Sequence, residues 1–123
     1  MEFLTQEEVI QVDAALLSSK EKFSTRLALY AKRCLQQISK EKQIDIESIQ
    51  SEQIQAWIRQ DEVIQKQIEL DNSFEAFFTK LVISSLKPLR QIASEENQPV
   101  ESLTVKQVIA WFEQQSKKNL AIE

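Results

Sequence analysis

The stretch EVIQ at residues 8–11 returns unchanged at residues 62–65, and the pattern QxxAWxxQ at residues 53–60 also returns 54 positions later. The alignment that these stretches anchor pairs residues 8–60 with residues 62–114 and contains 20 identities in 53 pairs. Unrelated helical stretches do not match at this level by chance. We therefore predict an internal duplication, and the two aligned segments are called the first half and the second half.

Composition narrows the fold class. A chain of 123 residues is long enough to bury one core as a single domain, spanning residues 1–123. It contains no glycine, which tight hairpins and phosphate-binding loops need where the backbone takes a positive φ. We predict an all-α protein, a compact bundle of about six helices built from two tandem three-helix repeats with pseudo-two-fold symmetry.

Start and stop signals place the helices. Ser or Thr followed three residues later by Glu or Gln is the capping-box spacing, and it occurs at Thr5, Ser18 and Thr104. The predicted helices span about residues 6–17, 18–42, 51–60, 62–70, 73–97 and 104–114. Residues 115–123 lie outside the repeat, and we expect them to form a C-terminal tail that frays.

Breaks between helices can be predicted from two prolines. Pro99 disfavours helical geometry at the residue before it, so a turn separates the second and third helices of the second half. Four apolar residues, the pairs Ile46/Val100 and Ile49/Leu103, are expected to anchor this turn to the core in each half. Pro88 falls inside the predicted helix 73–97, where it removes a backbone hydrogen bond, so we expect a kink near Ser84 and Ser85.

Helical periodicity of 100° per residue places four apolar residues of each long helix on one arc. These predicted core residues are Phe23, Leu27, Leu35 and Ile38 in the first half, and Phe77, Leu81, Leu89 and Ile92 in the second. Leu29 and Ile83 lie on the opposite side, which indicates that the long helices are covered on two faces.

The second half has a wider apolar arc than the first. Phe74, Phe78, Val82 and Leu86 stand where the first half has Lys20, Ser24, Ala28 and Lys32. This stripe has two interpretations. It is either the seam between the halves or an exposed surface that binds a protein partner or a second copy of the chain.

The two tryptophans, Trp57 and Trp111, occupy the same repeat position at the edge of an apolar helix stripe. One interpretation makes them equivalent core anchors. The other makes them paired aromatic walls of a cleft between the halves, which would hold a small apolar or aromatic ligand.

Several classes of chemistry lack their usual residues. The sequence has no histidine, the commonest general acid or base and a frequent metal ligand, and its one cysteine, Cys34, cannot complete a thiolate metal site. We predict no enzymatic activity, no metal, no cofactor and a buried, unreactive Cys34. The formal net charge is −4, with +1 on the first half and −3 on the second, so nucleic-acid binding is disfavoured.

No run of 18 apolar residues and no secretory leader pattern is present, so the sequence predicts a soluble, cytoplasmic protein without membrane partners. The favoured function is a non-enzymatic interaction or regulatory protein that uses Phe74, Phe78, Val82 and Leu86 as its partner-binding surface. The alternative is a small-molecule carrier or sensor with a ligand between Trp57 and Trp111. A nucleic-acid-binding regulator ranks third.

Overall fold

The chain folds into helices joined by short connections, as a computed structural model shows. The structure describes residues 4–62, 64–65 and 72–121, with the side chains of residues 72–74 and 119–121 outside this description. The elements are α1 (Gln6–Ala14), α2 (Ser19–Lys42), the 3-10 turn η1 (Ile46–Ser48), α3 (Ser51–Gln60), α5 (Asn72–Ser84), α6 (Leu86–Glu96), η2 (Val100–Ser102) and α7 (Val105–Ala121). Within the described ranges no strand occurs, which confirms the all-α prediction.

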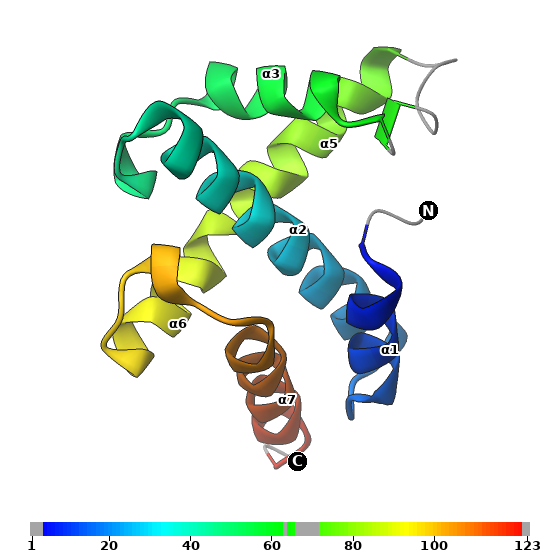
Figure 1. Cartoon of the computed structure of the whole chain (residues 1–123). Coiled ribbons are helices and arrows are strands. Elements are labelled where there is room, and N and C mark those ends of the chain that lie inside the picture. The colour runs from blue at the N-terminus through cyan, green and yellow to red at the C-terminus, as the bar shows by residue number, and fades with distance from the viewer. Residues whose placement is uncertain (1–3, 63, 66–71, 122–123) are drawn as a thin grey trace.

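Helix α2 is the centre of the arrangement. In Figure 1 it crosses α5 and α6, with α3 at one end of the molecule and α7 with α1 at the other. The third helix of each half packs against the second helix of the other half, α3 on α5 and α7 on α2. The two halves are therefore interlocked through their third helices and share one core. The predicted helix 62–70 lies largely outside the described residues.

Three capping boxes start helices at the predicted positions. At α1 the Glu8 N–H donates to Thr5 Oγ1 at 3.2 Å, and the Thr5 N–H donates to Glu8 Oε1 at 2.9 Å. Ser18 with Glu21 makes the same reciprocal pair at α2, and Thr104 with Gln107 makes it at α7. Each pair satisfies two backbone donors that would otherwise be orphaned at the helix start.

The two halves change direction at matching residues after their second helices. Gln43 ends α2 with φ 54° and Asn97 ends α6 with φ 56°, both left-handed and 54 positions apart. A 3-10 turn follows each of them, and its first residue, Ile46 or Val100, is buried in the core. The predicted apolar anchors are confirmed at these two positions and at Leu103, which is also buried.

The expected kink in the second half is a one-residue interruption of the helix. Helix α5 ends at Ser84 and α6 begins at Leu86, with Ser85 between them. Pro88 has no N–H to donate to the carbonyl of Ser84, so the helical hydrogen-bond ladder is interrupted at this point. On the α5 side, the Ser85 N–H and hydroxyl both donate to the Leu81 carbonyl, at 3.2 and 3.1 Å.

The predicted core arc is correct along most of its length and wrong at its start. Leu27, Leu35, Ile38, Leu89 and Ile92 are buried. In contrast, Phe23 and Phe77 are 47% and 57% exposed. At this end of each helix the buried side carries Thr25 or Thr79, two positions further on. Since two residues on a helix are 200° apart, the phenylalanines face solvent.

The last helix is longer than expected. Helix α7 continues to Ala121, seven residues past the predicted end at Gln114, and so extends into the segment predicted as a tail. The additional turns of α7 include a hydrogen bond from Ser116, a residue outside the two aligned segments. Ser116 is buried, and its hydroxyl donates to Glu21 Oε1 at 3.0 Å, which ties α7 to the first turn of α2.

Candidate functional site

The apolar stripe of the second half lies in the seam between the halves. Phe78 is 2% exposed and its ring meets the ring of Tyr30 on α2 edge to face, with centroids 5.3 Å apart. Val82 is fully buried, and Leu86 is half-buried against the same core. The side chain of Phe74 lies outside the described residues. Phe78 and Val82 therefore do not form an open docking surface in this fold, because they fill the space between α2 and α5.

A partly buried hydrogen bond between Tyr30 and Asp61 lies beside the contact of Tyr30 with Phe78. The Tyr30 hydroxyl donates to Asp61 Oδ2 at 2.6 Å, and Asp61 Oδ1 accepts from the Ile64 N–H at 3.4 Å. Burial, and then the bond to Asp61, raises the pKa of the Tyr30 phenol well above its usual value, so the hydroxyl stays protonated as a donor. The contact joins the centre of α2 to the residue that follows α3.

Cys34 lies on α2 close to the same contact and is fully buried. Burial raises the pKa of its thiol to about 12, and the negative charge of Asp61 adds to the effect. A thiol with so high a pKa holds almost no thiolate at neutral pH, and the thiolate is the reactive form. The prediction that Cys34 is a buried apolar residue is confirmed, and the residue is unsuited to act as a nucleophile.

The two tryptophans are both half-buried, but their surroundings differ. Trp57 meets Tyr30 edge to face, with ring centroids 5.7 Å apart. Trp111 meets its neighbour Phe112 at 5.0 Å, and its indole N–H donates to Glu95 Oε2 at 3.2 Å. The hollows beside Trp57 are lined by residues between 33 and 62, of which Glu62 belongs to the second half, and none of their lining residues comes from α7.

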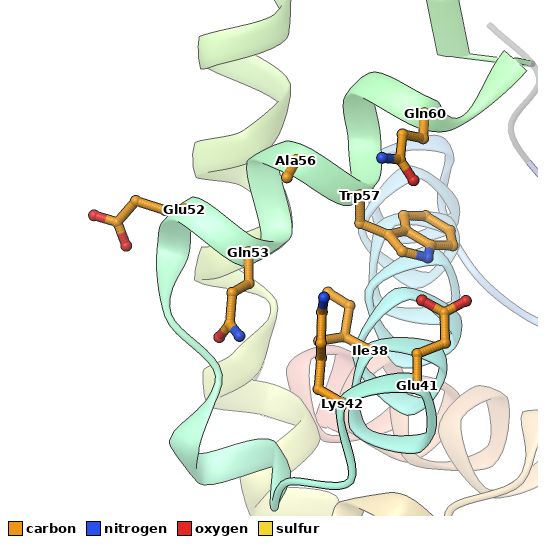
Figure 2. Close-up of a pocket in the computed structure, with 8 residues that line it drawn as sticks. All are labelled: Ile38, Glu41, Lys42, Glu52, Gln53, Ala56, Trp57 and Gln60. Carbon is orange, nitrogen blue, oxygen red and sulfur yellow. The ribbon is translucent and has the colours of Figure 1, made fainter.

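A hollow of about 280 Å³ opens between the end of α2 and the exposed face of α3. We call it the Trp57 hollow. It is lined by Ile38, Glu41, Lys42, Glu52, Gln53, Ala56, Trp57 and Gln60. Figure 2 shows the indole of Trp57 as one wall, with the Glu41 carboxylate pointing toward it from α2. The Glu52 carboxylate points outward at the rim, so the hollow combines an aromatic wall with polar groups of both charges.

Six of the eight lining positions carry the same residue in the second half, at residues 92, 95, 107, 110, 111 and 114. The two exceptions exchange charge, because Lys42 corresponds to Glu96 and Glu52 corresponds to Lys106. Sequence reasoning selected Trp57 but missed Glu41 and Lys42 as its neighbours. The repeat held the signal, since Ala56 and Gln60 are exposed in the structure and core packing does not explain why both halves carry them.

A second hollow shares Trp57 and Gln60 with the first. Arg33, Trp57, Gln60, Asp61 and Glu62 line it. Arg33 is paired with Glu8 of α1, and Asp61 accepts from Tyr30. The exposed carboxylate of Glu62 is therefore the acidic group of this second hollow that is accessible to a binding partner. Trp57 thus lines both hollows, and acidic side chains border both of them.

Two further classes of site are absent from the part of the chain that the structure covers. The described residues bring together no group of three or more acidic, histidine or cysteine side chains that could hold a metal ion. Nor does any described helix combine the length and the apolar character that crossing a bilayer requires. The Trp57 hollow is therefore the candidate site.

Comparison with known proteins gives one result. A family model described as NDH complex assembly factor CRR9 matches residues 4–119 of this chain. No curated protein and no solved structure gives a significant match.

Proposed function

Because this chain belongs to the CRR9 family of NDH complex assembly factors, we propose that it acts without catalysis, by binding a protein component of that complex. An assembly factor recognises other proteins, and recognition requires an accessible surface with at least one strong anchor. The feature that supports this role best is the Trp57 hollow, where a half-buried tryptophan is framed by polar side chains. Tryptophan in such a setting is among the commonest hot-spot residues of protein interfaces.

The chemistry of the chain supports a binding role. The sequence has no histidine, and its single cysteine is buried with a raised thiol pKa. The polar residues of the Trp57 hollow include no nucleophile paired with a base. Carboxylates, amides and an ammonium around an indole are suited to hydrogen bonds, ion pairs and stacking, which are the interactions of a protein interface.

The direct test is co-purification from the source cells. A tagged copy of the whole chain is expected to retain components of the NDH complex, identified by mass spectrometry, and Trp57→Ala is expected to lose them. Trp111→Ala is the matched control, since it removes the equivalent tryptophan of the second half. Equal retention by the wild type and Trp57→Ala would remove the hollow from the proposal, and no NDH component on the wild type would contradict the role itself.

Two alternatives use the same surface. A second copy of the chain could occupy the hollow, and light scattering over a range of protein concentrations would then report a dimer. A small apolar ligand is the other occupant, but of the eight residues that line the hollow only Ile38, Ala56 and Trp57 are apolar, whereas ligand pockets are lined mainly by apolar side chains. For this reason we place the protein partner first.

We further propose that the two halves descend from one duplicated unit and are related by a pseudo-two-fold axis. The sequence alignment, the matching left-handed residues and the exchange of third helices support this relation. An experimental structure in which residues 18–60 fail to superpose on residues 72–114 would contradict it.

A further inference from the structure

The charges around Trp57 are unbalanced. Glu41 and Glu52 border the Trp57 hollow, and Glu62 borders the adjoining one. None of these carboxylates takes part in the ion pairs that join the described residues. Lys42 is the opposing charge, reaches into the hollow from the end of α2 in Figure 2, and is likewise outside those pairs. Over the two hollows together, four carboxylates, Glu41, Glu52, Asp61 and Glu62, stand against two cations, Lys42 and Arg33. This surplus of negative charge attracts a cation.

The geometry of these groups fits an extended segment. Glu52 lies in the first turn of α3 and Glu62 lies just beyond its end, ten positions later. The helical part of this separation, from Glu52 to Gln60, is about 12 Å at 1.5 Å per residue, and the extended backbone of Asp61 adds to it. Trp57 and Glu41 stand between the two ends, as Figure 2 shows for the α2 and α3 sides of the hollow. About five residues of extended chain cover that distance.

On these grounds we propose that the Trp57 hollow receives an arginine side chain from a basic, extended segment of the partner protein. The guanidinium plane stacks on the indole face, and Ile38 at the base of the hollow contacts the apolar stem. Glu41 accepts hydrogen bonds from the guanidinium, and flanking basic residues pair with Glu52 and Glu62. This inference rests on the proposed function, because it names the chemistry of the protein partner at the same site.

The second half lacks the same combination, which makes the proposal selective. Glu95, the counterpart of Glu41, is already engaged by the Trp111 indole N–H. Around Trp111, Lys106 replaces Glu52 and Glu96 replaces Lys42, so these two exchanges cancel in charge. Ser116 stands two positions after Gln114, where Glu62 stands two positions after Gln60. With Glu95 engaged and a serine in the place of Glu62, a basic segment is expected to prefer the surroundings of Trp57.

The test uses the whole chain carrying Trp111→Phe, which leaves Trp57 as the only tryptophan and its fluorescence as the signal. The probe is a blocked five-residue peptide, Arg-Ala-Arg-Ala-Arg, compared with versions that contain citrulline or glutamate in place of arginine. We expect saturable binding of the arginine peptide, weaker by about tenfold for the neutral citrulline peptide and weakening further as salt rises. Equal affinities for the arginine and citrulline peptides, or tighter binding of the glutamate peptide, would overturn the proposal.

Point variants on exposed positions sharpen the result without disturbing the core. Glu41→Gln is expected to weaken the arginine peptide about threefold, and Lys42→Gln to strengthen it by about twofold. Glu95→Gln is the matched control and should leave the affinity unchanged. An effect of Glu95→Gln as large as that of Glu41→Gln would contradict the assignment to the first half.

The two proposals fail in different ways. If Trp57→Ala abolishes co-purification while the peptides do not differ, the partner-binding role stands and the arginine chemistry is wrong. If the arginine peptide binds as expected but no NDH component co-purifies with the wild type, the chemistry of the hollow stands and the assembly role fails.

Discussion

Each half carries a tryptophan at the same aligned position of its third helix, yet the surroundings of the two tryptophans differ. The Trp57 ring packs edge to face against the Tyr30 ring. The residue that corresponds to Tyr30 in the second half is Ser84, which has no ring. Trp111 packs on Phe112 instead and donates to Glu95. An identical residue therefore keeps the same position on its helix in both halves. The residues around it that differ between the halves determine whether it packs in a closed contact or lines an open hollow.

The long helices show the same principle on a larger scale. Helix α2 is continuous over Ser19–Lys42, whereas the second half divides the corresponding length into α5 and α6. This difference in helix continuity is explained by one pair of aligned positions, which holds buried Cys34 in the first half and Pro88 in the second.

Exchanging the residues at this position gives the largest expected effect. Cys34→Pro should lower the free energy of unfolding by about 3 kcal/mol or more, beyond the packing lost with the thiol, because α2 has no break to absorb the ring. Pro88→Ala should change stability by less than about 1 kcal/mol, since the Ser85 region already carries its own hydrogen bonds. Urea unfolding measures both, with Cys34→Ala as the control for lost volume. Similar losses for the two exchanges would mean that the halves tolerate a break equally.

The next largest difference in stability is expected between substitutions of Phe77 and Phe78, two adjacent phenylalanines of α5. Phe78→Ala should cost about 3 kcal/mol, because the ring is buried against Tyr30 and its removal leaves a cavity. Phe77→Ala, and Phe23→Ala at the matching position of α2, should each cost less than about 1 kcal/mol, since these rings face solvent. Thermal unfolding of the three variants would rank them. A loss at Phe77 equal to that at Phe78 would mean that the exposed ring is covered in solution.

A smaller effect is expected where the halves differ in polar contacts. Tyr30→Phe removes the donor to Asp61, a hydrogen bond to a charged acceptor, and should cost about 1.5–2 kcal/mol. Its counterpart Ser84 is exposed and bonds only within its own helix, so Ser84→Ala should stay within about 0.5 kcal/mol. Equilibrium denaturation distinguishes the two. If Tyr30→Phe proved neutral, water would be replacing the phenol at Asp61.

Local signals predicted much of this fold from the sequence. The capping boxes at Thr5, Ser18 and Thr104 and the break caused by Pro88 depend on residues within a few positions of each other. For that reason they can be predicted without knowing which helix packs against which.

Tertiary packing explains what the sequence could not predict. Phe23 and Phe77 continue an apolar arc but remain exposed among the described residues, so periodicity alone placed them wrongly in the core. The extension of α7 depends on Ser116 meeting Glu21, 95 positions away. The candidate site was predicted only as far as Trp57, because Glu41 reaches the hollow through the angle between α2 and α3.

The smallest expected effect concerns the two left-handed residues, where the halves agree in geometry and differ in side chain. A β-carbon is unfavourable at φ near +55°, and asparagine tolerates this region better than glutamine. Gln43→Gly should therefore raise the free energy of unfolding by about 0.5–1 kcal/mol, and Asn97→Gly by less, because the entropy that glycine loses on folding offsets part of each gain. Chemical denaturation of both variants, with Gln43→Asn as an intermediate step, would give the order glycine, asparagine, glutamine at position 43. A loss of stability on Gln43→Gly would mean that the glutamine side chain contributes more at the end of α2 than its backbone strain costs.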